Sequence, residues 1–267
     1  MKDEVHCSAK QALKDGIMDA EIYDSELVEA FGSKTKHSIA RFVDVPIKSV
    51  IALQPRVFYA PESSWRDAVQ GLSCDGWATC RDKIVDYFTS DLKDNYFPPY
   101  DSKGELRIGF TGGAAYCLLG NHRMAAAKAW LAANYGEEAV LKKAKCYYYE
   151  ISPPLKALML ECLEKGYALK YAHRPTTDDK LPEHLDHNIV KVEKALCRFD
   201  IYKLDTQKDS LACIKPSPNP LSRLFRMDTR SKYSRRKFQE VPATLLQKML
   251  DDGEAIKMFE DSNCKPE

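Results

Sequence analysis

Four consecutive residues, Gly120-Asn121-His122-Arg123, combine side-chain types and a backbone geometry that suit the binding of phosphate groups. Gly120 can adopt backbone angles closed to other residues, and it therefore permits a sharp turn from a strand into a helix. Asn121 is a favoured N-cap for the helix predicted after it. The amides of the first helical turn, the positive end of the helix dipole and the charge of Arg123 then converge on one point. The alternative is an ordinary capped helix whose His122 and Arg123 lie in solvent.

The residues around this tetrad predict a β-hairpin followed by a helix. Residues 105–110 alternate between polar and apolar types, Thr111-Gly112-Gly113 favours a tight turn, and Tyr116-Cys117-Leu118-Leu119 predicts a short buried strand. An alanine-rich segment with apolar residues on one helical face continues to Ala133. We therefore expect the tetrad at the exit of the hairpin, where the helix begins.

Hydrophobic periodicity elsewhere predicts a mixture of helices and strands. The expected elements are a helical N-terminal arm to Ser33, strands at 38–46, 47–53 and 145–151, and helices at 62–72, 81–92, 152–163, 182–199 and 244–259. The fold class that follows is α/β (α+β), a small mixed sheet flanked by helices, with helical N- and C-terminal extensions.

Composition limits the possible functions. The chain has 267 residues, of which 44% are hydrophobic, and can bury a substantial core. Its net charge of +1 excludes a polycation that is drawn as a whole to nucleic acid or membrane. Nine cysteines occur without a CxxC pair, and no apolar leader precedes them, which predicts reduced thiols and a cytoplasmic location. No segment is long or apolar enough to span a bilayer, so no membrane partner is expected.

A proline-rich segment, Lys215-Pro216-Ser217-Pro218-Asn219-Pro220, predicts a linker before a C-terminal appendage. The appendage begins with seven cations that face one acid, Asp228. These cations are Arg223, Arg226, Arg230, Lys232, Arg235, Arg236 and Lys237. They either contact a phosphate backbone or form a solvated surface. The expected divisions of the chain are 1–37, an N-terminal arm; 38–151, the domain that contains the tetrad; 152–214, a helical extension packed on it; and 215–267, the linker and appendage.

A pair of histidines is the other candidate site. His184 and His187, next to Glu183 and Asp186, have a spacing that could ligate a metal on one face of a helix. Two histidines three residues apart on a charged helix are more commonly solvated surface. The sequence alone leaves both interpretations open.

Two groups of residues together resemble a known superfamily. A strand that starts near Val45-Pro46-Ile47 and ends in Gln54-Pro55-Arg56 precedes a helix, and a hairpin then enters Gly120-Asn121-His122-Arg123-Met124-Ala125-Ala126. This arrangement resembles the N-terminal domain of ParB partition proteins and of sulfiredoxin. The resemblance extends over roughly residues 42–151, which is under half of the chain.

The resemblance implies a nucleotide-binding protein. Members of this superfamily bind nucleotides, and their activities include CTP hydrolysis, ATP-dependent phosphoryl transfer and reported nuclease action. The resemblance places the loop of Gly120, Asn121, His122 and Arg123 against the phosphates, and it makes Arg56 a second contact across the site. A nucleoside triphosphate, ATP or CTP, is then the expected ligand, with Mg²⁺ bridging its phosphates.

Departures from the family pattern narrow the chemistry. Sulfiredoxins carry their catalytic cysteine where this chain has Asn121, and Cys117 lies back in the predicted strand, so repair of an oxidised thiol is not expected. ParB proteins have an arginine at the position of His122 and a helix-turn-helix after this domain, which this sequence lacks. Related DGQHR-type proteins of DNA modification and phage defence have a polar residue before His-Arg, as here, and are closest in loop chemistry.

The expected activity is hydrolysis of the nucleotide or transfer of its phosphate. His122 and Arg123 are the candidate catalytic residues. Serine kinases of the superfamily use a carboxylate soon after the first strand, where this chain has Gln54, and Glu62 is the nearest acid. One alternative is a non-catalytic DNA-binding or partner-binding protein that keeps the loop as an anion site. Another is a helical interaction protein in which the tetrad is accidental.

Overall fold

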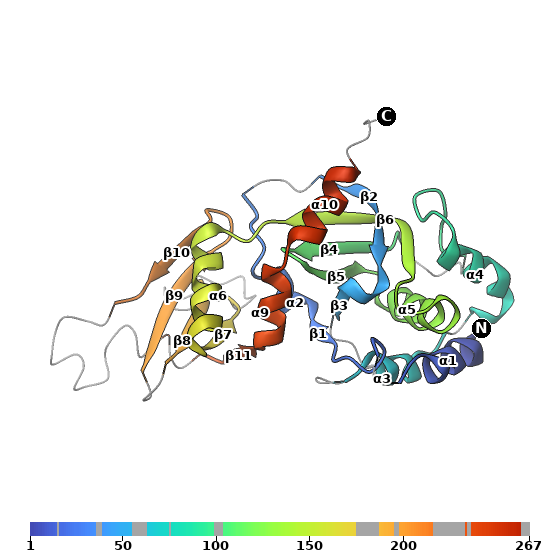
Figure 1. Cartoon of the computed structure of the whole chain (residues 1–267), viewed down its shortest axis with the longest axis horizontal. Helices are drawn as coiled ribbons and strands as arrows, with labels where there is room; N and C mark the ends of the chain where they lie inside the picture. The colour runs from blue at the N-terminus through green and yellow to red at the C-terminus, as the bar shows by residue number, and fades with distance from the viewer. Residues whose placement is uncertain are drawn as a thin grey trace. The chain divides into compact units, whose positions relative to one another are not determined.

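Backbone hydrogen bonds join the strands into two separate sheets (Figure 1). The computed structural model describes residues 1–14, 16–35, 39–54, 63–74, 76–98, 104–174, 187–194, 198–215, 233 and 236–262. It is a mixed α and β structure, as the sequence predicts. No helix in these ranges is long and apolar enough to cross a membrane.

The chain divides into two units that differ from the predicted divisions. Unit 1 consists of Met1–Glu29, Ser38–Tyr149 and Asp251–Glu267. Unit 2 consists of Ala30–His37 and Glu150–Leu250. Both ends of the chain therefore belong to the unit that contains the tetrad, whereas the sequence suggests a separate arm and a separate appendage.

Unit 1 is built on a mixed sheet. Its strands are β1 (Tyr23–Asp24), β2 (Arg41–Pro46), β3 (Val50–Leu53), β4 (Arg107–Thr111), β5 (Ala114–Leu119) and β6 (Val140–Tyr149). In the described residues they pair in the order β1-β3-β5-β4-β6-β2. Strands β4 and β5 form the predicted antiparallel hairpin, while β3 runs parallel to β5 and β4 parallel to β6. The prediction of a mixed sheet is confirmed.

Helices cover this sheet. They are α1 (Lys2–Gln11), α2 (Ser25–Glu29), α3 (Trp65–Gln70), α4 (Arg81–Thr89), α5 (Asn121–Tyr135) and α10 (Gly253–Asp261), with short 3-10 turns η1 (Ile47–Ser49) and η2 (Ala78–Cys80). Helix α5 is buried from Arg123 to Ala132, and both α1 and α3 pack against it (Figure 1). Its alanines let neighbouring backbones approach closely, so α5 is the central helix of unit 1.

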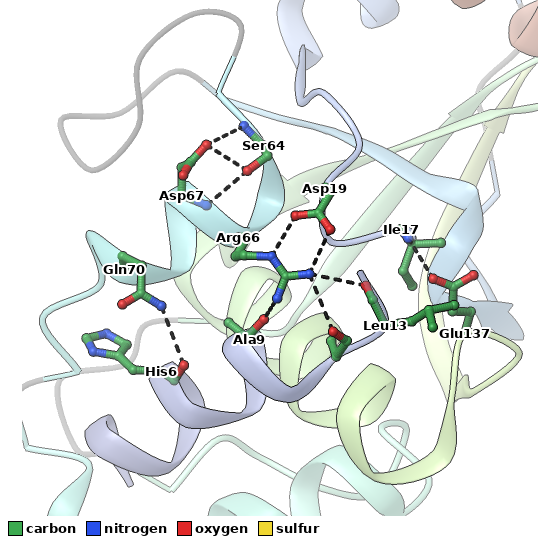
Figure 2. A network of polar contacts seen from close by, with 11 residues as sticks. His6, Ala9, Leu13, Ile17, Asp19, Ser64, Arg66, Asp67, Gln70 and Glu137 are labelled. Carbon is green, nitrogen blue, oxygen red and sulfur yellow. Dashed lines mark hydrogen bonds and ion pairs between the residues drawn. The ribbon is translucent and has the colours of Figure 1, made fainter. Parts of the chain in front are cut away.

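Arg66, in the first turn of α3, joins α3 to the N-terminal segment of unit 1 (Figure 2). Its guanidinium donates hydrogen bonds to the carbonyl oxygens of Ala9, Ala12 and Leu13, at the C-terminal end of α1. These are carbonyls that a helix cannot satisfy internally, and a cation there also complements the helix dipole. In its described residues the predicted arm is helical only in α1 and α2, and between them it adds β1 to the sheet.

Unit 2 is built on an antiparallel sheet, where the sequence predicts a helical extension. Its strands are β7 (Ala168–Ala172), β8 (Asn188–Glu193), β9 (Phe199–Asp205), β10 (Ser210–Cys213) and β11 (Gln239–Val241). Among described residues they pair in the order β10-β9-β8-β7-β11. Helices α6 (Pro153–Lys165) and α9 (Ala243–Leu250) belong to the same unit, and α6 confirms the helix predicted after Ser152.

The predicted helix at 182–199 is wrong, because residues 188–193 form strand β8. Apolar residues three and four apart, such as Ile189 and Val192, suggested a helix. Val190 is buried as well, and this β-branched cluster packs well on a pleated sheet.

The predicted C-terminal helix is two helices, α9 and α10, which are separated at Asp251 and Asp252. Helix α10 is part of unit 1. The Phe259 ring lies 5.5 Å from that of Phe110 and 5.4 Å from that of Tyr148, and Arg41 donates a hydrogen bond to the Phe259 carbonyl at 3.0 Å. The end of the chain thus contributes to the core of unit 1.

Candidate functional site

The turn before α5 has the geometry that the sequence predicts. Strand β5 ends at Leu119, Gly120 adopts a left-handed conformation with φ 99° and ψ 37°, and α5 begins at once. The amide of Met124 closes the first helical turn by donating to the Gly120 carbonyl at 2.8 Å. A Cβ atom at Gly120 would lie 3.0 Å from Nε of Arg123 and 3.0 Å from Cδ1 of Leu106. The left-handed conformation favours glycine here, and a side chain at this position would also crowd those of Arg123 and Leu106.

The role predicted for Asn121 as N-cap is wrong. Gly120 occupies the N-cap position, and Asn121 is the first helical residue. The Asn121 side chain is buried, and its Oδ1 accepts a hydrogen bond from the backbone amide of Gln54 at 3.2 Å. Because the left-handed glycine turns the chain so sharply, this side chain faces the end of β3 instead of the helical amides.

Lys128, which the sequence analysis missed, is a second side chain that bonds α5 to the backbone of β3. It is 1% exposed, donates from Nζ to the Val50 carbonyl at 2.6 Å, and lies 3.9 Å from the centroid of the Trp65 ring. Asn121 and Lys128 are seven residues apart and so lie on one face of α5. Helix α5 is therefore bonded to both ends of β3. Lys128 bonds to the first residue of the strand, and Asn121 bonds to the residue just after the last one. Two polar residues two helical turns apart in an alanine-rich segment were the sequence signal that could have indicated these contacts.

Arg123 is not solvated, so the alternative of a surface arginine is wrong. It is 5% exposed, and its Nη1 donates to the Gly104 carbonyl at 2.8 Å. The guanidinium carbon lies 5.5 Å from the centroid of the Phe97 ring. Burial raises the pKa of Tyr87, and the nearby charge of Arg123 partly offsets this rise. The side chain of Arg123 therefore supports the backbone around Gly104.

His122 is exposed, although Asn121 and Arg123 on either side of it are buried. It lies in the first turn of α5, where backbone amides and the helix dipole favour anions. Of the tetrad's side chains, the imidazole of His122 is therefore the one that a ligand in solvent can reach directly.

A pocket lies near the buried Arg123 and was also missed by the sequence analysis. Its lining residues are Phe42, Tyr87, Leu92, Lys93, Asn95, Tyr96, Phe97, Gly104, Glu105, Leu106 and Lys145. Lys145 forms an ion pair with Glu105 at 2.8 Å, and this contact lowers the pKa of the carboxyl group. Arg123 touches both Phe97 and Gly104, so the first turn of α5 supports one wall of the pocket. These residues come from distant segments, and their sequence spacing contains no motif.

Comparison with known proteins identifies no relative from which a function could be inferred. No protein-family model, curated protein or solved structure gives a significant match to this chain.

Several predicted site residues lie outside the described part of the chain. They are Arg56, Glu62, His184, Arg223, Arg226, Arg230, Lys232 and Arg235. Of the basic run, Lys237 is exposed, and Arg236 donates to the carbonyl oxygens of His173 and His187. Within the described ranges, no group of three or more His, Cys, Asp or Glu side chains is placed to hold a metal ion.

Proposed function

We propose that this chain binds a nucleoside triphosphate, ATP or CTP, with Mg²⁺ at the N-terminus of α5, and that it hydrolyses the nucleotide or transfers its phosphate. The observation that carries this proposal is the left-handed Gly120, with φ 99° and ψ 37°, between strand β5 and the 15-residue helix α5. A phosphate group at the start of a long helix matches both the amide hydrogens of its first turn and the helix dipole.

The surrounding residues support this assignment in different ways. His122 reaches the ligand side of the turn, and we assign it the contact with the transferred phosphate. Asn121 fixes the amide of Gln54 at 3.2 Å. Arg56, two residues after Gln54 in the sequence, remains the proposed second phosphate contact. Glu62 remains the proposed acid in the same connection.

Arg123 has a changed role in this proposal. Its guanidinium is directed to Gly104, so it positions the adjoining loop and adds positive charge beneath the first turn of α5. Mg²⁺ is part of the proposal because these few cations cannot neutralise a triphosphate and align it for in-line transfer. The hairpin, turn and helix also support a ParB and sulfiredoxin type of fold for unit 1, which we propose with the function.

The second candidate function is a non-catalytic anion site in a DNA-binding or partner-binding protein. The burial of Arg123, at 5% exposed, favours this candidate, because a guanidinium that holds a loop is not available to stabilise charge on a transferred phosphate. Binding without turnover would distinguish this function from the enzymatic one.

Calorimetry of the full chain with ATP and with CTP, each with and without Mg²⁺, tests the proposal, and phosphate release measures turnover. We expect binding of one nucleotide that strengthens with Mg²⁺ and weakens in His122→Ala. Absence of any triphosphate binding by the unmodified chain would overturn the proposal. Binding without phosphate release would select the second candidate.

A further inference from the structure

We propose that two copies of this chain associate through strand β10 of unit 2, which pairs antiparallel with the same strand of a second copy. Strand β10 (Ser210–Cys213) lies at one edge of the five-stranded sheet, next to β9 (Figure 1). Because this surface belongs to unit 2, the inference goes beyond the proposed function and does not require that a nucleotide binds at α5.

The backbone of β10 presents hydrogen-bonding groups on its outer side. The amide of Ile214 donates to the carbonyl of Ile201 at 2.8 Å, which fixes which residues of β10 bond to β9. In an antiparallel pair, successive residues alternate between bonded and non-bonded positions. Ala212 is therefore bonded to β9, whereas the amides and carbonyls of Leu211 and Cys213 point away from it. These four groups match the backbone of another extended strand.

The other edges of the two described sheets carry features that hinder strand addition. Proteins protect edges with very short strands, charges, proline, bulges or a covering element. Strand β1 has two residues, and β11 has three, which include Glu240 and end before Pro242. Strand β2 contains a register shift, ends at Pro46 and contacts α10. Strand β10 has four uncharged residues and an unshifted register with β9, so it is the edge that is open to another strand.

The side chains of β10 suit a twofold pairing that is centred on Ala212. Ser210, Ala212 and Cys213 are exposed, and Leu211 is half-buried. In this register Ala212 lies opposite Ala212 of the second copy, at a non-bonded position where the two strands come closest, and a methyl group is small enough to fit there. Leu211 of each copy then lies opposite Cys213 of the other, so all four outward-pointing backbone groups of each strand are used.

The residues on either side of β10 favour a second copy of the chain as the occupant. Asp209 and Lys215 are each three positions from Ala212, so the same register places Asp209 of one copy opposite Lys215 of the other, twice. The Asp209 carboxylate is held by a hydrogen bond from Thr35 Oγ1 to its Oδ2 at 2.9 Å, and this hydroxyl donor does not neutralise its charge. Lys215 is exposed. Opposite charges that face each other across antiparallel strands stabilise the pair.

The proposed interface is small, because each copy contributes one strand of four residues and the residues next to it. Interfaces of this size belong to weak, transient complexes. Pairing occupies the β10 edge of both copies, so the assembly closes at two chains. We therefore expect a dimer that dissociates on dilution and does not grow into larger assemblies.

Sedimentation equilibrium of the full chain under reducing conditions, between about 10 µM and 1 mM, tests this inference over the range of weak association. We expect a monomer–dimer equilibrium. Ala212→Lys and Ala212→Asp should each weaken the dimer by about tenfold or more, because the twofold axis places like charges directly opposite each other. An equimolar mixture of these two variants should regain association, since it places a lysine opposite an aspartate.

Matched variants separate the backbone of β10 from its side chains. Cys213→Pro removes an amide hydrogen that points away from β9, so it should weaken the dimer and leave the β9–β10 pair intact. Cys213→Ser keeps that amide and removes the thiol, and it should associate like the unmodified chain. Gln11→Lys adds the same charge at an exposed position of α1 in unit 1 and should have no effect. Thermal melts check that each variant is folded.

Three results would overturn the inference. The first is a monomer at every concentration, which would leave the β10 edge to an extended segment of a different protein. The second is a dimer that is equally stable in Ala212→Lys, Ala212→Asp and Gln11→Lys, which would place the contact elsewhere on the chain. The third is a mixture of the two Ala212 variants that stays monomeric, which would exclude the twofold register.

Discussion

Arg66 and Asp19 form an ion pair with two hydrogen bonds, Nε to Oδ1 at 2.6 Å and Nη2 to Oδ2 at 2.8 Å (Figure 2). The same guanidinium also reaches the carbonyl oxygens at the end of α1. One side chain of α3 therefore satisfies both a carboxylate and a helix terminus in the N-terminal segment. The planar guanidinium is needed for this, since lysine cannot form the two parallel bonds.

Arg66→Ala should lower the free energy of unfolding by about 2–3 kcal/mol, the range for charge-assisted hydrogen bonds that are largely buried. Arg81→Ala is the matched control. Arg81 also makes two bonds to one carboxylate of the N-terminal segment, that of Glu4, but its side chain is 52% exposed against 21% for Arg66. The control should cost at most about 1 kcal/mol. Equal losses in denaturant unfolding would contradict the importance of burial at Arg66.

Gly120→Ala should destabilise the chain more than Gly166→Ala. Both glycines are left-handed, with φ 99° and ψ 37° at Gly120 and φ 64° and ψ 33° at Gly166, and each substitution carries the left-handed penalty of about 1–2 kcal/mol. At Gly120 the new Cβ also meets Leu106 and Arg123 at 3.0 Å, whereas nothing lies within 4 Å at Gly166. We expect an additional cost of about 1 kcal/mol or more at Gly120. Identical unfolding midpoints for the two variants would show that this contact relaxes freely.

His122→Ala and Arg123→Ala should separate chemistry from stability. His122 is exposed, so its removal should leave the melting temperature unchanged. Because we assign this residue the contact with the transferred phosphate, the same substitution should abolish nucleotide turnover. Arg123 is 5% exposed, and its removal should cost about 2–4 kcal/mol of stability through the lost hydrogen bond and ring contact. Thermal melts and phosphate release, measured on both variants, check this. Early melting of His122→Ala with full specific activity would assign that residue a structural role.

Thiol labelling at pH 8 should divide the cysteines by burial. Cys7 and Cys213 are exposed and should react quickly. Burial raises the pKa of Cys162 to about 11 and also raises that of Cys146, so both remain protonated thiols at pH 8. They should react only as the protein opens. Peptide mapping after a short exposure to a thiol reagent tests this, and labelling of Cys162 as fast as Cys7 would contradict it.

Any affinity for nucleic acid should depend on the basic run and fall steeply with salt. Replacing Arg223, Arg226 and Arg230 by Gln should weaken binding and reduce the salt slope by about 0.9 for each lost phosphate contact. Substitution is a better test than truncation, because α9 and α10 lie beyond the run and α10 is part of unit 1. An unchanged salt slope in the triple variant would move the nucleic-acid surface to unit 1.

The sequence by itself determined the local features of this protein. The alternation of β4 and β5, the turn between them and the need for a glycine at position 120 are set by residues a few positions apart. Steric limits on φ and the two-residue period of a strand act at that short range, so they can be inferred without a fold. The start of α6 after Ser152, with proline in its first turn, follows from the same kind of rule.

Only the tertiary structure decided how side chains are used. Asn121 is 67 residues from Gln54 and Arg123 is 19 from Gly104, and no local pattern indicates that these groups meet. Residues 188–193 form a strand because neighbouring strands supply hydrogen bonds to both sides, although their apolar spacing also fits a helix. Where two periodicities fit one short run, long-range pairing decides the outcome, because the sheet buries Ile189, Val190 and Val192 together.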